Sequence, residues 1–191
     1  MVEYEHKIVW RKFIEGDKQA FANIYNQHIA TLYRYGTKLS DDDDLIKDVI
    51  QEVFIDLYLK RENIKSTPEH LKYYLILAFK RNLIKKLKQN RKKIEIHNFD
   101  LIFEPEYSIE DNIIENEEDA LLNQRVSKVL KNLPGKQKEA IYLRYNESME
   151  YFQIAKILNI TIDSARKQVY RAMLSIRKQL GNKTLLLWMI Q

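Results

Sequence analysis

Glycine and proline are rare in this chain, with four glycines and three prolines among 191 residues. Both residues interrupt regular structure, and an ordinary protein contains roughly 12% of the two together, about three times the share found here. Turn-rich all-β folds, collagen-like chains and glycine-rich phosphate-binding loops all need more of them. The scarcity therefore favours uninterrupted helices and predicts an all-α protein.

The chemistry of the side chains excludes several classes of function. Cysteine is absent, which excludes disulfides, thiolate nucleophiles and cysteine-bound zinc. The histidines lack the spacing of metal ligands, and no nucleophile has a visible base. We therefore expect no metal, cofactor, small-molecule substrate or catalytic site. The charged N-terminus does not resemble a signal peptide, and the longest apolar run, Leu185–Ile190, is far shorter than the ~20 residues of a membrane span, so we expect a cytoplasmic protein.

Charge divides the chain into three blocks. Residues 1–93 carry a net charge of +6, residues 94–120 carry −10 without any Lys or Arg, and residues 121–191 carry +9. A segment with charges of one sign repels itself and is typical of a linker. The pattern predicts two small helical domains joined by an acidic flexible linker. We expect domains over 1–93 and 119–183, the linker over 94–118, and an apolar tail over 184–191.

Apolar periodicity predicts the helices of the first domain. Pairs of apolar residues recur every four positions from Leu45 to Tyr58, which marks one face of a helix. Asp41–Asp44 lie at its start, where carboxylates cap free amides and oppose the helix dipole. A second helix is expected from Phe21 to Tyr33, after the cap Asp17, and an opening helix over Ile8–Ile14.

The last helix of the first domain is strongly basic. It is expected after the cap Thr67, with Pro68 at its first position, and to run from about Glu69 to Arg91. Residues 72–93 hold nine Lys and Arg and no acid. This balance favours nucleic acid, because each neutralised phosphate releases counterions; a solvated lysine-rich face is the alternative. On this helix we expect DNA contacts from Lys80, Arg81, Lys85, Lys86 and Lys88.

Two helices near the C-terminus have the spacing of a helix-turn-helix. A short helix over Tyr151–Leu158 is followed by a turn at Asn159 and Ile160, and Thr161 caps a longer helix that ends near Leu180. The second helix of such a motif enters the major groove by its N-terminal half. An ordinary helical hairpin with basic side chains is the alternative. The DNA contacts expected there are Arg166, Lys167, Gln168, Tyr170 and Arg171.

Two stretches resemble bacterial RNA polymerase sigma factors of the extracytoplasmic-function (ECF) type, which are sigma-70-like proteins. Asp48–Phe54, with the sequence D-V-I-Q-E-V-F, is similar to the family's D-L-V-Q-E-V-F helix. Leu133–Ala140, together with the helix-turn-helix, resembles the family's promoter-reading domain. The resemblance implies that the first domain is sigma region two and that the second is sigma region four.

The resemblance also implies the partners. They are core RNA polymerase (the clamp helices of its β′ subunit and the β flap), promoter DNA and an anti-sigma factor. Region two would bind the core and melt the −10 element, and region four would read the −35 element. The core contacts implied by the matching motif are Asp48, Gln51, Glu52 and Phe54.

Two other functions fit the same residues. One is a helix-turn-helix regulator that binds duplex DNA without joining polymerase, and the other is a helical module whose basic faces bind acidic proteins. Tight binding of the chain alone to duplex DNA would indicate the regulator, because a sigma factor is expected to bind weakly by itself. A steep salt dependence of DNA binding would exclude the protein-binding module.

Overall fold

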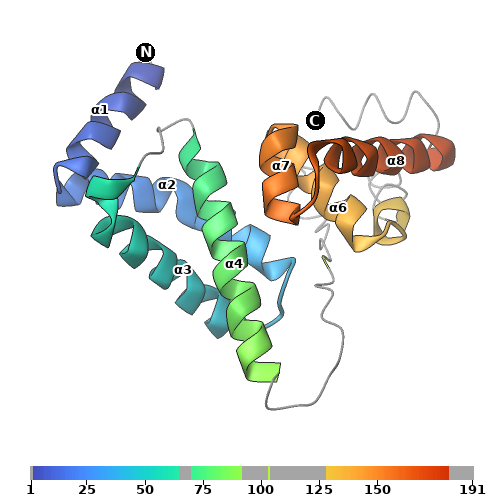
Figure 1. Cartoon of the computed structure of the whole chain (residues 1–191), viewed down its shortest axis with the longest axis horizontal. Helices are drawn as coiled ribbons and strands as arrows, with labels where there is room; N and C mark the ends of the chain where they lie inside the picture. The colour runs from blue at the N-terminus through green and yellow to red at the C-terminus, as the bar shows by residue number, and fades with distance from the viewer. Residues whose placement is uncertain (1, 65–69, 92–102, 104–127, 181–191) are drawn as a thin grey trace, which may run out of the picture. The chain divides into compact units, whose positions relative to one another are not determined.

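The computed structural model describes residues 2–64, 70–91, 103 and 128–180 (Figure 1). These residues form helices and connecting turns without a strand, which confirms the all-α prediction. The chain divides into two compact units, Met1–Asp100 and Leu101–Gln191. The expected cap Thr67, the apolar tail and all of the expected linker except Phe103 lie outside the described residues.

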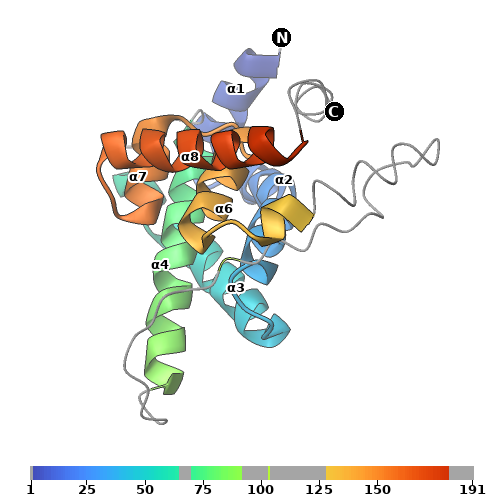
Figure 2. The same ribbon diagram turned by 90° about the vertical axis from the view of Figure 1, so that its right-hand side faces the viewer.

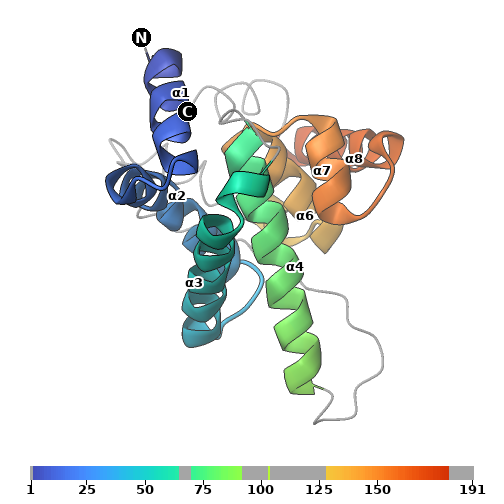
Figure 3. The ribbon, with the colours of Figure 1, turned by 60° about the vertical axis from the view of Figure 1, so that its left-hand side comes forward.

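The described residues of the first unit are helical apart from short connecting turns (Figure 3). The opening helix begins earlier than expected, at Val2 rather than Ile8. α4 is described from Leu71, and its expected start at Glu69 lies outside the described residues. The elements are α1 (Val2–Ile14), α2 (Lys18–Thr37), α3 (Asp43–Leu59), η1 (Arg61–Asn63) and α4 (Leu71–Arg91).

Local caps define where α2 and α3 begin, as predicted. Gly16 adopts a φ of +91°, which side chains disfavour, and reverses the chain after α1. The Asp17 carboxylate then accepts a hydrogen bond from the Ala20 amide at 2.9 Å. At the start of α3, Asp42 accepts from the Leu45 amide at 3.0 Å. Each carboxylate satisfies an amide that has no partner within its helix.

The core of the first unit lies where α2, α3 and α4 pack against one another. Buried side chains come from all three helices, including Leu32 and Tyr35 of α2, Val49 of α3 and Leu75 of α4. The ring of Tyr35 meets the ring of Phe79 with 6.2 Å between centroids. The apolar faces that the sequence predicted thus form one core.

Gly36 lies inside α2, where its presence had no explanation in the sequence. It is buried, and a Cβ atom placed on it would lie 2.8 Å from Cγ2 of Ile46 and 2.8 Å from Cζ of Phe79. Ile46 belongs to α3 and Phe79 to α4. The residue is therefore a glycine because two neighbouring helices place side chains against this point of the α2 backbone.

The second unit is built from short helices around α8 (Figure 2). Pro134 lies between one helical segment and the next, and Gly135 begins α6. α6 continues through Tyr142 as one turn of π-helix. The elements are α6 (Gly135–Ile141), η4 (Tyr142–Asn146), α7 (Tyr151–Leu158) and α8 (Ile162–Leu180).

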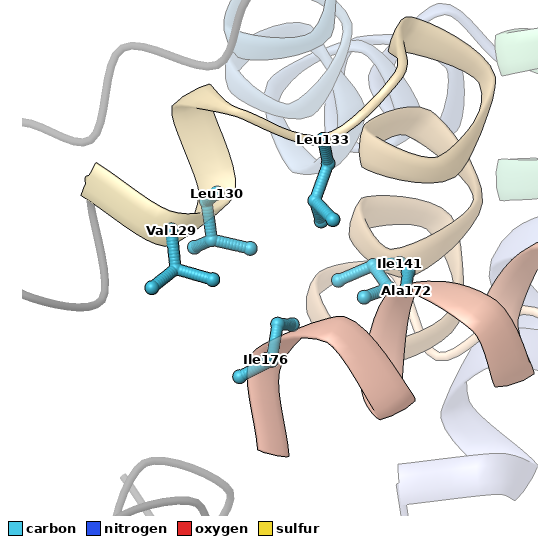
Figure 4. Close-up of a cluster of buried hydrophobic side chains, with 6 residues drawn as sticks. All are labelled: Val129, Leu130, Leu133, Ile141, Ala172 and Ile176. Atoms are coloured by element: carbon cyan, nitrogen blue, oxygen red, sulfur yellow. The ribbon is translucent and has the colours of Figure 1, made fainter. Parts of the chain in front are cut away.

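One apolar cluster joins the segment before α6 to the second half of α8 (Figure 4). Leu130 and Ile176 are fully buried, and Met173 packs against the same cluster. Because Leu130 precedes α6 and Ile176 lies near the end of α8, the cluster holds the second half of α8 to the rest of the unit. The cluster consists of Val129, Leu130, Leu133, Ile141, Ala172 and Ile176.

We expect Gly36→Ala to destabilise the first unit. The added methyl group overpacks the contact with Ile46 and Phe79, which costs ~1–3 kcal/mol, while the better helix propensity of alanine offsets about 1 kcal/mol. Urea denaturation followed by circular dichroism measures the difference. Asn26→Ala, at an exposed position of α2, is the control and should be neutral or slightly stabilising. A variant that is about 1 kcal/mol more stable than the wild type, as the helix propensity of alanine alone would give, would contradict the close approach.

Candidate nucleic-acid and protein interfaces

Caps define the starts of α7 and α8, and a left-handed residue joins the two helices. The Glu150 amide donates to Gln153 Oε1 at 2.9 Å in a capping box that begins α7. Asn159 ends α7 in the left-handed region, with φ 52° and ψ 51°. Thr161 Oγ1 then accepts from the Ser164 amide at 3.1 Å and caps α8, as predicted. The two helices are packed against each other, which makes this a helix-turn-helix.

α8 separates cleanly into a buried and an exposed face. Ala165, Val169 and Ala172 are buried at a spacing of three or four residues, so the positions between them point outward. Four of the five predicted DNA contacts, Arg166, Lys167, Tyr170 and Arg171, are exposed, and Tyr170 retains 67% of its surface. Gln168 is half-buried.

Tyr151 supports the arginine nearest the turn. The Arg166 guanidinium lies 5.8 Å from the centre of the Tyr151 ring, and the Arg144 guanidinium lies 5.0 Å from it. Arg144 also donates to the Met149 carbonyl oxygen at 2.8 Å. Arg166 is thus held on an aromatic platform, and it also pairs with Asp163 at 3.3 Å. This platform is not apparent from the sequence, because it depends on contacts between separate elements.

The outward face of α3 carries the first three residues of the predicted polymerase contact. Asp48, Gln51 and Glu52 are exposed. The same side of the helix continues into two exposed apolar side chains, Ile55 with 56% and Leu59 with 68% of their surface accessible. Ile55 and Leu59 are not among the contacts predicted from the sequence. Their signal is that each is apolar and yet falls outside the repeating apolar pairs that mark the buried face. The face therefore combines carboxylates with apolar surface.

Phe54 requires a correction. Its side chain is only 2% exposed, and its ring packs against Tyr25 at 4.7 Å and Phe21 at 6.3 Å between centroids. It lies four residues after Ile50 and three before Leu57, which are also buried. Phe54 thus holds α3 against α2 and does not present a surface for direct contact with polymerase.

Lys80 on α4 requires a second correction. Its side chain is 8% exposed, and it is therefore not available on the surface for DNA. It lies four residues after Ile76 and three before Leu83, both buried, so the helical period places it at the core face. The neighbouring cations of the predicted set, Arg81, Lys85 and Lys88, are exposed.

An ion pair joins the two predicted interfaces of the first unit. Lys86 Nζ of α4 lies 2.7 Å from Glu52 Oε1 of α3, and the two side chains are 26% and 51% exposed. The sequence predicts a polymerase contact for Glu52 and a DNA contact for Lys86, and their proximity is apparent only in the fold. Nearby on α3, Asp56 pairs with Lys60 at 2.7 Å, and its carboxylate raises the pKa of the Lys60 ammonium.

A second exposed network lies at the start of α3. The Tyr33 hydroxyl of α2 donates to Asp43 at 2.6 Å, and Lys47 pairs with the same carboxylate. The hydrogen bonds from Lys47 and Tyr33 lower the pKa of Asp43, and the hydrogen bond to Asp43 raises the pKa of Tyr33. The network links α2 to the first turn of the helix that carries Asp48.

The described residues show neither a metal-binding cluster nor a membrane-spanning helix. Within the described ranges, no three His, Asp or Glu side chains gather where a metal ion could bind. Among the same residues, no helix is both long and apolar enough to span a bilayer.

The fold and its exposed faces define a protein of two helical units, the second of which carries a helix-turn-helix with exposed basic side chains. Two family models match the chain: Sigma-70 region 2 over residues 24–93 and Sigma-70, region 4 over residues 123–176. The two matches lie in the order predicted from the sequence.

Curated relatives match over most of their length. The ECF RNA polymerase sigma factor SigW of Bacillus subtilis is 26% identical over 187 residues, covering 87% of this chain and 91% of that protein. The ECF RNA polymerase sigma-E factor of Haemophilus influenzae is 25% identical over 177 residues, covering 88% and 89%. The chain belongs to the sigma-70 family and is a sigma factor of the ECF type.

Two solved structures share the fold. CnrH, in complex with the cytosolic domain of CnrY, matches with a TM-score of 0.54 at 15% identity, covering 90% of this chain and 94% of that one. The sigma factor RpoE of Bartonella quintana, in complex with the anti-sigma factor NepR, matches with a TM-score of 0.53 at 19% identity, covering 85% and 95%. These likenesses agree with the assignment of two helical units.

We expect Asn159→Ala to destabilise the helix-turn-helix and Asn159→Gly to leave it nearly unchanged. A left-handed conformation costs a residue with a Cβ about 1–2 kcal/mol, and Asn and Gly tolerate it best. Thermal unfolding followed by circular dichroism measures the two variants side by side. An alanine variant as stable as the glycine variant would contradict the left-handed turn.

Proposed function

We propose that this ECF sigma factor binds core RNA polymerase and directs promoter-specific transcription initiation, in the cytoplasm and without catalysis of its own. One observation carries the proposal. A single chain combines an exposed acidic and apolar face on α3, within the region 2 match, with an exposed basic helix in a helix-turn-helix, within the region 4 match. A regulator that acts without polymerase needs only the second of these.

The polymerase-binding surface is assigned to the outward face of α3. Asp48, Gln51 and Glu52 supply polar and charged groups, which favour correct orientation and rapid association. Ile55 and Leu59 supply apolar area that a partner could cover, as in the buried centre of protein interfaces. Phe54 supports this surface indirectly, because its buried ring packs α3 against Phe21 and Tyr25 of α2.

Promoter contacts are assigned to α4 and α8. Arg81, Lys85 and Lys88 offer phosphates an exposed row of cations on α4. On α8, Arg166 and Arg171 are exposed in the N-terminal half, the part of such a helix that enters the major groove, and we assign them to base edges. The first helix is assigned to the −10 element and the second to the −35 element.

An anti-sigma factor is the remaining proposed partner. Both solved structures described above are complexes, one with the cytosolic domain of CnrY and one with the anti-sigma factor NepR. By analogy, a regulatory protein of this kind would cover the apolar and acidic face of α3, because that face is exposed and carries Ile55 and Leu59. It would then compete with polymerase.

Promoter-dependent transcription tests the function. Combined with bacterial core polymerase and a promoter library, the purified chain should yield transcripts that begin at defined promoters and are absent with core alone.

Asp48→Lys should weaken core binding about tenfold or more, because reversal of an interfacial charge costs a few kcal/mol. Asp48 is chosen over Glu52 because Glu52 also pairs with Lys86.

The matched control for this charge reversal is Glu15→Lys, at an exposed position outside the proposed surfaces. It should bind core polymerase with the affinity of the wild type. Absence of promoter-dependent initiation by the wild type would refute the sigma function. Equal core binding by Asp48→Lys and Glu15→Lys would refute the assignment to α3.

Arg171→Ala should reduce transcription from promoters that depend on the −35 element. Loss of a base or phosphate contact costs ~1–3 kcal/mol, or roughly fivefold to a hundredfold in affinity. Lys178→Ala, also exposed but at the far end of α8, should have a small effect, because the N-terminal half of the helix enters the groove. Equal losses in both variants would indicate non-specific attraction instead of groove recognition.

A further inference from the structure

Three side chains from three elements of the second unit meet at one aromatic ring. Tyr151 is the first residue of α7. The Arg144 guanidinium of η4 lies 5.0 Å from the centre of the Tyr151 ring, and the Arg166 guanidinium of α8 lies 5.8 Å from the same centre. Both distances are within the ~6 Å over which a ring attracts a cation. The position of Arg166 thus depends on residues outside α8.

Tyr151 is itself held in place by its neighbours. The Glu150 amide donates to Gln153 Oε1 at 2.9 Å, which fixes the backbone at the start of α7. Arg144 Nη1 donates to the Met149 carbonyl oxygen at 2.8 Å and to Glu150 Oε1 at 3.3 Å. Only 31% of the Arg144 side chain is exposed. Arg144 therefore serves as a support for the ring, since its Nη1 donors are already used.

Arg166 is oriented by two contacts and still keeps donors for a ligand. Its Nη1 donates to Asp163 Oδ1 at 3.3 Å, and 62% of its side chain is exposed. Among the described residues, no acceptor takes its Nε or Nη2. Lys167 and Arg171 are exposed as well, but within the same residues neither has an ion pair or a ring contact. A side chain that is already ordered loses less entropy when it binds, so Arg166 is the cation of this group prepared for a directional contact.

We propose that Tyr151 is a positioning residue for base recognition: its ring, held by Arg144, orients Arg166 toward the base edges of the major groove. The inference rests on the proposed function, because it takes α8 to be the helix that contacts promoter DNA. Base edges are read by donors in defined directions, whereas attraction to phosphates depends on charge. Loss of the ring should therefore lower sequence discrimination and leave phosphate attraction unchanged, because both arginines remain.

The test is sequence selection by the full chain from a library of random-sequence DNA duplexes. Low salt is used, because it strengthens the weak binding expected of the chain without polymerase. Fluorescence anisotropy then compares the duplex that the wild type prefers with a scrambled duplex of the same composition. The ratio of the two affinities measures discrimination, and the affinity for the scrambled duplex measures phosphate attraction. A wild type that selects no preferred duplex would overturn the inference.

Tyr151→Leu and Tyr151→Phe separate the ring from the hydroxyl. The leucine variant should lower the ratio about twofold to fivefold, the effect of one exposed cation–π contact, with the affinity for the scrambled duplex unchanged. The phenylalanine variant retains the ring and should keep the wild-type ratio. A loss in the phenylalanine variant would mean that the hydroxyl contacts DNA directly, and it would overturn the positioning role. A leucine variant with the wild-type ratio would overturn it as well.

Phe152→Leu is the matched control, because it removes a ring from the next residue of α7, where the side chain is 45% exposed. It should keep the wild-type ratio. Thermal unfolding of each variant shows whether the second unit stays folded. If Tyr151→Leu lost affinity for both duplexes alike, the ring would be needed for the helix-turn-helix as a whole, and the positioning role would fail.

Arg166→Ala connects the ring to the arginine. By itself it should lower the ratio roughly fivefold to a hundredfold. Tyr151→Leu added to Arg166→Ala should cause no further loss, because the ring acts through the arginine, whereas additive losses would overturn the inference. If the preference depends on the ring and yet no promoter-dependent transcription occurs with core polymerase, the sigma function fails and the role of Tyr151 stands.

Discussion

The first unit depends on the missing side chain at Gly36. Ile46 of α3 and Phe79 of α4 both lie where a Cβ atom on this residue would be, at 2.8 Å, so one glycine sets the distance of two helices from α2. Protein interiors are close-packed and shift little without loss of contact. The contact of Ile46 and Phe79 with Gly36 therefore sets the positions of α3 and α4 from their buried sides. The polar residues on the outward faces of these helices contribute little to those positions.

This arrangement gives one small helical unit two faces of opposite charge. The outward face of α3 presents Asp48 and Glu52 beside apolar Ile55, whereas α4 presents Arg81 and Lys85. A polyanion is attracted to the cations of α4 and repelled by the carboxylates of α3. A protein with basic groups is attracted to α3 and repelled by α4. The separation agrees with the proposed function, in which the first unit contacts both polymerase and DNA.

Local signals in the sequence predicted the helices and their starts well. Asp17, Asp42 and Thr161 cap as expected, because a cap depends only on the next three residues. Gly36 could not be explained from the sequence, because its neighbours come from two other helices. The predictions for Lys80 and Phe54 are wrong for another reason. The positive charge of Lys80 and the motif around Phe54 favour a surface position, but the helical period places both residues on buried faces.

The contact between Glu52 and Lys86 limits how strongly the two proposed partners of the first unit can influence each other. The pair is close, at 2.7 Å, but both side chains are partly exposed, and such pairs contribute about 0–1 kcal/mol. Polymerase that takes up Glu52 frees Lys86 for phosphate, and by reciprocity DNA that takes up Lys86 frees Glu52. A pair of this strength gives a coupling of at most about fivefold. It can adjust the order of binding, but a larger gain in DNA affinity on joining polymerase must arise from groups outside this pair.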